Sequence, residues 1–462
     1  MPERLKLYLV VLALFLSACR IAGVADSAMG EVNATQSQAA DVQEVPSEPP
    51  FVSGDWYSGD PHIHDFGCGL AFSPGALFEM MGQADLDVGS ALVWGQSFEA
   101  DEGQFTGEDW RGSTDERILH FDLEVSAFPS DLMGHFIPLN LKSIDFPRRL
   151  YTLPIAEWAR PQGAVTGFAH ASEWIEPYAF PEPGMGTPPY ELPIDLAFGL
   201  VDYVASEDFF SDNGKPLESV AFVWGSLLNA GFRLAIVGAS DFPCLEQSVG
   251  AVRTWVLVEG GFSYENWVEG IRKGRTVVTQ GGDDFLSFTV NEAVIGSQLN
   301  LEEGTASVTV DVEGALGSPG LVEILVNGEV VASQMVSSRT EQNFSLEIPL
   351  TQSSWIAARA PRVQTRAIYV LVGGQPIRAS ARDAQFWADY IENLVEQIES
   401  GEFLRQDIDP AEYENEMREA IPCYLEARDI FAQRAAEARS RTVVLGTPQA
   451  LFASKDCDTL LY

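Results

Sequence analysis

Short apolar runs alternate with helix-like segments between residues 53 and 283. Four runs are apolar almost throughout and end near a polar residue, namely Leu86–Gly95, Gly163–His170, Gly199–Ser206 and Phe232–Asp241. Such runs are typical of strands that are buried on both faces of a parallel sheet. Apolar residues recur with helical spacing before the first and the last of them. The pattern predicts an α/β fold, either a barrel or a doubly wound sheet.

The pattern changes after residue 283, where short alternating strands are separated by Gly, Asn and Ser. Asn327-Gly328 lies between two apolar runs and is a strong hairpin signal. Residues 284–378 therefore predict a small all-β sandwich domain. Residues 379–462 predict a helical C-terminal segment, in which Asp409 is the expected N-cap of a helix and Pro410 lies in its first turn.

The first 18 residues have the pattern of an export signal, with Arg4 and Lys6 before an apolar run and small residues after it. Residues 16–19, "LSAC", resemble the lipobox of bacterial lipoproteins, in which the cysteine is acylated. The resemblance implies lipidation at Cys19, and a plain secretory signal is the alternative. Residues 19–52, which contain no aromatic residue before Phe51, predict a disordered tether. We therefore expect a protein of the bacterial cell envelope that is lipid-anchored in the outer membrane or faces the periplasm.

Composition narrows the function classes. Apolar residues make up 46% of the 462 residues and charged residues 21%, so a large core is expected. The net charge of −39 argues against a nucleic-acid partner, because binding a polyanion requires Lys and Arg. After residue 20 no apolar stretch is long enough to span a membrane. The sequence leaves the oligomeric state open.

All five histidines lie in the predicted α/β part. His62 and His64 are two residues apart, so on a strand their imidazoles point to the same side. They are either a metal-ligand pair or part of a polar loop. His120, Asp122 and Glu124 also share one face of a predicted strand, which is compatible with a zinc, manganese or iron site or with a buried ion pair.

The segments that carry these residues resemble a known enzyme family. They are "GDPHIH", "LDVGSALVWG", "STDERILHFDLEVSAFPSDLMGHFIPLNL", "GFAH", "LPIDLAFGLVDYVAS", "LLNAGFRLAIVGASDFPC", "SYENWVEGIRKGRTVVTQGG" and "VEILVNGEVV". Their order between about residues 55 and 340 is similar to that of PHP-domain metallohydrolases of the carbaryl-hydrolase-like (CehA/McbA) type. The resemblance implies that residues 53–283 form a distorted (β/α)7 barrel with metal ions at the carboxyl ends of its strands.

By motif, the resemblance assigns metal binding to six residues: His62, His64, Glu124, His135, His170 and Asp241. His62 and His64 match the first ligand pair, and Glu124 matches a carboxylate that can bridge two metals. The family implies one or two divalent ions, of zinc, manganese or iron. Glu124, His170 and Asp241 are the expected catalytic residues.

The sequence departs from the family at two places. A typical member has an Asp-His pair after the second strand, where this chain has "VWGQ" and only Gln96 could be a ligand. The fourth motif is usually Asp-x-His, whereas Phe-Pro follows Asp241. Asp65 or Cys68 are alternatives for filling the gap. His120 is left over and is expected to be structural or to support a ligand.

Two functions follow from this pattern. The first is a hydrolase in which a metal-activated water cleaves an ester, amide, carbamate or phosphoester bond of a small molecule. Arg253 and Arg275 could contact an oxyanion or a phosphate, or could be structural. The missing ligands motivate the second function, a degenerate barrel that binds a ligand or carbohydrate without turnover. A further alternative is that the β-sandwich itself is the binding element.

Four cysteines follow Cys19 and allow three pairings. Cys423 and Cys457 both lie late in the chain and form a natural pair, which leaves Cys68 and Cys244. Because Cys68 follows His64 and Cys244 follows Asp241, both are expected at the mouth of the barrel. We hypothesise that they form a disulfide between two ligand loops, as an exported protein allows.

Overall fold

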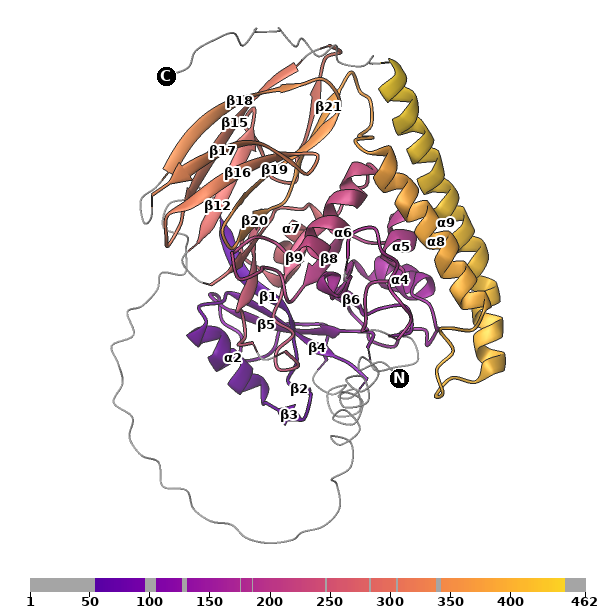
Figure 1. The fold of residues 1–462 in the computed structure, drawn as a ribbon. Helices are drawn as coiled ribbons and strands as arrows, with labels where there is room; N and C mark the ends of the chain where they lie inside the picture. Colours follow the sequence, from indigo (N-terminus) through magenta and orange to yellow (C-terminus); the bar gives the residue numbers. More distant parts are fainter. Residues whose placement is uncertain are drawn as a thin grey trace, which may run out of the picture. The chain divides into compact units, whose positions relative to one another are not determined.

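The computed structural model describes residues 55–95, 105–126, 131–174, 176–184, 186–245, 247–281, 284–304, 306–337 and 342–444 (Figure 1). The predicted signal peptide, the lipidation residue Cys19 and the tether through residue 52 lie outside the described residues, as do Gln96 and Cys457. The described residues belong to one compact unit that spans Val45–Tyr462. They form a mixed α/β structure of sheets and helices.

Three buried parallel strands organise the first sheet. β1 (Trp56–Ile63), β4 (Val88–Val93) and β5 (Ile118–Leu123) pair in parallel in that order. On the other side of β1, β10 (Val252–Leu257) pairs antiparallel and continues to β11 (Thr276–Gln280). Burial on both faces explains why the sequence of β4 is an unbroken apolar run.

A second sheet contains the other strands of the α/β half. β6 (Phe136–Leu139) pairs antiparallel with β7 (Val165–Phe168), and β8 (Tyr203–Ser206) and β9 (Ala235–Gly238) continue the sheet in parallel. The apolar runs that predicted strands therefore contain β4, β7, β8 and β9. All four of these strands are buried, as their composition predicted.

The two sheets meet through isolated bridges. Val125, after β5, bridges to Phe136 in β6, and Ile63 in β1 bridges to Phe242, after β9. The ladders are not continuous at these points, and no closed barrel is formed by hydrogen-bonded strands within the described residues. The (β/α)7 barrel thus stays a prediction, while the mixed α/β class is confirmed.

Short helices connect these strands. They are α2 (Pro74–Gln83), α4 (Leu153–Ala159), α5 (Leu192–Ala197), α6 (Glu218–Asn229) and α7 (Tyr264–Arg272), with 3₁₀ turns η2 (Arg160–Gln162) and η3 (Ala171–Glu173). The hydroxyl of Ser73 accepts a hydrogen bond from the Ala76 N–H, which caps the start of α2. A small hairpin, β2 (Phe66–Gly67) and β3 (Leu70–Ala71), follows β1 directly.

The β-rich half packs two sheets around an apolar core (Figure 1), which also includes Trp56, Trp255 and Val277 of the first sheet. One sheet has the order β13 (Ala293–Val294), β12 (Phe285–Val290), β15 (Ala306–Ala315) and β18 (Gln342–Leu350). The other contains β14 (Gln298–Leu301), β21 (Ile368–Val372), β19 (Ser354–Ala360), β20 (Val363–Thr365), β16 (Gly320–Val326) and β17 (Glu329–Val336).

The sheet of the β-rich half that contains β20 is continuous with the first sheet of the α/β half. β11 and β20 pair antiparallel, with Val277 opposite Thr365 and Thr279 opposite Val363. A single 11-stranded sheet therefore crosses the predicted boundary between residues 283 and 284. The predicted division into domains stays a prediction. The hairpin at Asn327-Gly328 is confirmed, because Val326 and Glu329 pair across it.

Two long helices end the described chain and lie side by side (Figure 1). α8 (Ala381–Glu399) starts at Ser380, whose hydroxyl accepts from the Asp383 N–H. α9 (Pro410–Val444) starts after Asp409, which accepts from the Ala411 N–H and confirms the predicted N-cap. No helix among the described residues is long and apolar enough to span a membrane.

Candidate metal centre

The structure brings all six candidate ligands together at one end of the strands. His62 lies in β1 and His64 directly follows it, while Glu124 follows β5 and His170 and Asp241 follow β7 and β9. His135 precedes β6, and because β6 runs antiparallel to β7, its start lies at the same end. Polar side chains at strand ends, which looked unrelated in the sequence, therefore converge in space.

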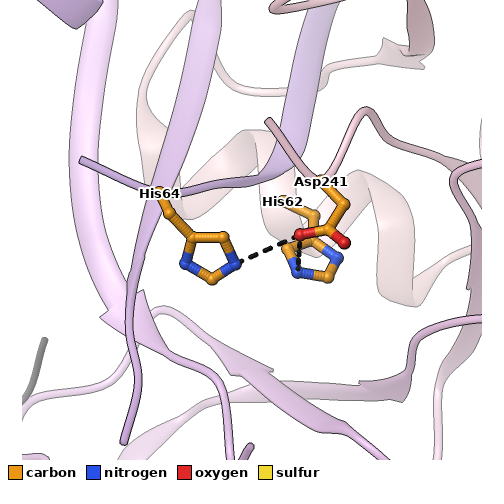
Figure 2. Close-up of side chains that lie close together, drawn as sticks. All are labelled: His62, His64 and Asp241. Atoms are coloured by element: carbon orange, nitrogen blue, oxygen red, sulfur yellow. Dashed lines mark ion pairs between the residues drawn. The ribbon is translucent and has the colours of Figure 1, made fainter. Parts of the chain in front are cut away.

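Four side chains form the first group. Asp241 Oδ1 lies 3.3 Å from His62 Nε2 and 3.3 Å from His64 Nε2. Figure 2 shows the Asp241 carboxylate facing both imidazoles. Glu124 Oε2 lies 3.5 Å from His62 Nε2 and 3.3 Å from His64 Nε2. The two imidazole nitrogens and two carboxylate oxygens thus face one common point.

A second group shares Glu124 with the first. Glu124 Oε1 lies 2.8 Å from His135 Nδ1, which in turn lies 2.9 Å from His170 Nε2. The three ligand atoms lie within 4.8 Å of one another, as do those of His62, His64 and Asp241. Because its two oxygens face different groups of histidines, Glu124 is placed between two sets of metal-compatible atoms.

Glu207 supports both groups, and the sequence did not single it out. Its Oε1 lies 3.0 Å from His62 Nδ1, and its Oε2 lies 2.9 Å from His170 Nδ1 and accepts from the His170 N–H at 3.1 Å. A carboxylate on one ring nitrogen fixes the tautomer that leaves the other nitrogen free for a metal. Glu207 follows β8, so the rule that drew attention to His170 and Asp241 also applied to it.

His64 is held in the same way by the backbone. Its Nδ1 lies 3.0 Å from the Leu92 carbonyl oxygen at the end of β4, which orients Nε2 toward Glu124 and Asp241. His64 and Glu124 are 1% and 2% exposed, respectively. The ligand atoms are therefore fixed before any ion binds.

One buried atom indicates that the donor set suits a cation. His62 Nε2 is buried and makes no hydrogen bond, although it faces two carboxylate oxygens at 3.3 and 3.5 Å. A buried polar atom without a partner is unfavourable unless something else binds it. Imidazole nitrogens with carboxylate oxygens are ligands for zinc, manganese or iron, so these residues fit a divalent ion.

The electrostatics of the centre are strongly coupled. Burial lowers the pKa of His62, but the charges of Glu124 and Asp241 outweigh it and hold that pKa well above its ordinary value. Burial also lowers the pKa of His64 and of His170. Contacts with carboxylates outweigh this effect and raise both pKa values to about 9. Burial raises the pKa of Glu124, yet the neighbouring imidazoles bring it well below its ordinary value. The cluster therefore pairs carboxylates with positive charge.

The loop after β9 is tied to the end of β1. The His64 N–H donates to the Phe242 carbonyl at 2.7 Å, and Cys68 and Cys244 form a disulfide, as hypothesised. The disulfide makes Cys68 unsuitable as a replacement ligand, so that alternative was wrong. Cys423 pairs with no described cysteine, and its pairing with Cys457 stays a prediction because Cys457 lies outside the described residues.

Hydrogen bonds of Asp60, in β1, also connect β1 to the segment after β9. Its carboxylate accepts from the Ser240 hydroxyl at 2.5 Å, the Ser240 N–H at 3.1 Å and the Gly250 N–H at 2.8 Å. Burial raises the pKa of Asp60 to about 6, although these hydrogen bonds oppose the rise. Asp241 itself has a φ of 49° and His170 a φ of 60°, backbone conformations that need support from such surroundings.

The remaining candidates lie outside the centre. The ring of His120 stacks on Tyr264 with centroids 4.0 Å apart, and its Nδ1 lies 2.9 Å from Asp109 Oδ1, so its role is structural. Arg253 is buried and donates to the Gly250 carbonyl, while Arg275 pairs with Glu259. These two arginines do not contact the six candidate ligands.

No protein-family model and no curated protein matches the chain. Among solved structures, it is similar to a two-domain protein from Bacteroides vulgatus described as containing a predicted PHP-like metal-dependent phosphoesterase. That match has 12% identity and a TM-score of 0.38, and it covers 75% of this chain and 98% of the other. An engineered protein also matches, at 12% identity and a TM-score of 0.14, over 62% of this chain and 49% of the other.

Proposed function

We propose that this protein is a metal-dependent hydrolase with a centre for two divalent ions. The observation that carries the proposal is the position of Glu124, whose two oxygens face separate groups of buried histidines. His62, His64, Glu124 and Asp241 would hold one ion. Glu124, His135 and His170 would hold the other.

The ligand sets suggest where reaction takes place. The second set offers three side chains, which leaves coordination positions for water and substrate. Asp241, His135 and His170 are the more accessible members, with side chains 10%, 16% and 9% exposed, whereas the Glu124 side chain is 2% exposed. Substrate would therefore approach from the side of these three residues.

A bound divalent ion would supply a water of lowered pKa and would polarise the oxygen of the bond under attack. Glu207 would keep His62 and His170 protonated at Nδ1, so that each presents its Nε2 lone pair. The Asp241 carboxylate, at the accessible edge, would accept the proton from the attacking water. The Cys68–Cys244 disulfide would limit movement of the loop that carries Asp241.

The substrate class follows from the sequence resemblance to the CehA/McbA type. We propose a small molecule with an ester, amide, carbamate or phosphoester bond. The net charge of −39 disfavours a nucleic acid. The lipobox at residues 16–19 supports a lipid-anchored protein of the cell envelope, with Cys19 as the lipidated residue.

Metal analysis of the full chain after reconstitution with zinc, manganese or iron tests this proposal. We expect about two ions per chain, together with hydrolysis of chromogenic esters or phosphoesters that stops on chelation and resumes when metal is restored. Failure to retain any metal would contradict the enzyme function. Retained metal without hydrolysis of any ester, amide, carbamate or phosphoester would favour a non-catalytic binding protein instead.

A further inference from the structure

A cavity of about 370 Å³ lies at the ends of the strands opposite to the candidate metal centre. Arg233 lines it and precedes β9, whereas Asp241 of the candidate metal centre follows β9. Arg272 at the end of α7, Arg275 just before β11 and Tyr369 near the start of β21 also line it. We call it the basic cavity, because its lining includes five cationic side chains: Arg233, Arg272, Lys273, Arg275 and Arg366.

This concentration of positive charge is unusual for the chain. Five of its 28 Lys and Arg residues line one cavity, in a protein with a net charge of −39. The acidic side chain in the lining is Asp202, whose carboxylate already accepts from Arg160 at 3.2 Å and from the Thr166 N–H at 3.1 Å. The cavity therefore carries a local positive charge that its own acid does not neutralise.

Arg366 is the buried member of the set and is 3% exposed. Its Nη2 donates to the Tyr369 hydroxyl at 2.9 Å, but its Nε has no hydrogen-bond partner. A Cβ at Gly274 would lie 1.0 Å from Arg366 Nη1, so the guanidinium lies directly over a glycine. Among the described residues, no carboxylate forms an ion pair with Arg366. A buried, unpaired guanidinium at a cavity is a binding group for an anion.

The ring of Tyr369 lies near two guanidinium groups of the cavity. The Cζ atoms of Arg233 and Arg366 lie 5.1 and 5.5 Å from the centroid of its ring. Arg233 donates to the Gln298 side chain and, within the part of the chain described here, has no carboxylate partner. Two like charges held against one ring repel each other, and an anion between them would relieve that repulsion.

The carboxylate partners of the other three cations are exposed, and Arg272 also donates to the Gly163 and Ala164 carbonyl oxygens. Arg275 and Lys273 pair with Glu259 at 2.7 and 3.6 Å, and Arg272 pairs with Glu269 at 3.1 Å. The Glu259 and Glu269 side chains are 60% and 41% exposed. Ion pairs this exposed contribute little, so Arg275 and Lys273 can turn to a ligand at small cost.

We propose that the basic cavity binds a small phosphate monoester. A phosphate dianion can accept paired hydrogen bonds from Arg233 and Arg366 and be neutralised by the surrounding cations. A volume of about 370 Å³ is larger than a phosphate ion needs and matches the lower range of small-molecule sites, so an organic group can be included. This inference is independent of the hydrolase proposal.

The test measures binding of glycerol 3-phosphate to the chelator-treated full chain by isothermal titration calorimetry. Inorganic phosphate and glycerol, the two components of this ester, are titrated separately for comparison. We expect saturable binding of glycerol 3-phosphate, weaker binding of phosphate and none of glycerol. Arg233→Gln should weaken binding about tenfold, since a charge-assisted hydrogen bond is lost. Arg418→Gln removes another exposed charge, which forms an ion pair with Glu414, and should leave binding unchanged.

Three outcomes would overturn the proposal. The first is no saturable binding of glycerol 3-phosphate by the wild-type chain. The second is equal binding by the Arg233→Gln and Arg418→Gln variants. The third is loss of binding in His62→Ala, which would locate the phosphate at the candidate metal centre. Because Arg233 is exposed, its substitution is not expected to affect folding.

Discussion

Two clusters of buried carboxylates respond to burial in opposite ways. In the candidate metal centre, Glu124 and Glu207 are 2% and 1% exposed, yet neighbouring histidines outweigh burial and lower the pKa of both. Between α5 and α9, Glu191 and Asp195 are also fully buried. There burial prevails and raises the pKa of Glu191 to about 7 and that of Asp195 well above its usual range.

The partners explain the difference. Glu191 accepts from the Thr152 N–H at 2.5 Å and from the Tyr424 hydroxyl, and Asp195 accepts from the Thr152 hydroxyl at 2.7 Å. These donors are neutral, and no cation among the described residues forms an ion pair with either acid. Burial alone therefore favours the protonated acid, whereas imidazoles favour the carboxylate that a metal requires. Of the two clusters, only the one with histidines suits a divalent ion.

The largest expected effect comes from removing a histidine of the first cluster. His62→Ala should lower metal affinity and hydrolysis by more than about 100-fold, since even supporting residues of metal sites contribute 10–100-fold. Elemental analysis and initial rates measure the effect. His120→Phe is the matched control, because His120 stacks on Tyr264 outside the centre. Equal metal content in the two variants would refute the assignment.

The second cluster predicts a pH dependence of stability. Because the pKa of Glu191 in the folded chain, about 7, exceeds its ordinary 4.5, the folded chain keeps a proton that the unfolded chain releases. The resulting stability is complete below about pH 4.5 and is lost as pH rises through 7, by on the order of 3 kcal/mol. Glu191→Gln should flatten this decline in the free energy of unfolding between pH 5 and 8.

Chemical denaturation of the chelator-treated chain at pH 5 and at pH 8 measures that decline in the free energy of unfolding. Glu399→Gln, which replaces an exposed glutamate of α8, is the control and should keep the wild-type slope. If the stability of the wild-type chain rises over the same interval, Glu191 is ionised in the folded state and the contrast between the clusters fails.

Glu207→Gln tests whether an acid that touches two histidines acts through them. The amide keeps the shape but loses the charge, so we expect metal affinity to fall by roughly 10–100-fold while the folded structure persists. Competition with a chromogenic chelator measures affinity, and circular dichroism monitors the fold. Asp208→Asn removes the adjacent, exposed charge as the control. Identical metal affinities for both variants would mean that the charge of Glu207 does not act on metal binding through the two histidines.

The smallest effect is expected for the disulfide. Cys68→Ser with Cys244→Ser should lower metal affinity by less than about tenfold, below the range for direct supporting residues. The backbone hydrogen bond from His64 to Phe242 still connects the two loops in this variant. The pH dependence assigned to Glu191 should not change. A loss of metal as large as in His62→Ala would show that the disulfide, not the backbone, positions Asp241.

Much of the candidate centre was predictable because its residues follow a local rule. Buried strands are recognisable from their apolar runs, and His64, Glu124, His170 and Asp241 lie within three residues after such strands. Glu207 obeys the same rule but was missed, since no motif of the resembling family was matched to it. Its role depends on contacts with His62 and His170, which are 145 and 37 residues away.

The sheet pairings were less predictable. Alternation correctly indicated strands in the β-rich half, and Asn327-Gly328 correctly indicated a hairpin. The pairing of Val277 with Thr365, however, joins strands that are distant in sequence and individually ordinary. Local patterns describe which faces are buried but not which distant edge a strand joins. For the same reason the basic cavity, with Arg233 and Arg366 from different halves, left no trace in the sequence.

The β11–β20 ladder has a consequence for how this protein could be shortened or recombined. A chain cut at residue 283 would expose the hydrogen-bonding edge of β11, which includes Val277 and Thr279. An open edge of this kind recruits other strands and favours aggregation. We therefore expect the α/β half to aggregate as a separate fragment unless a foreign strand or a charged edge replaces β20. Swapping whole modules at that position is accordingly a poor strategy for engineering this protein.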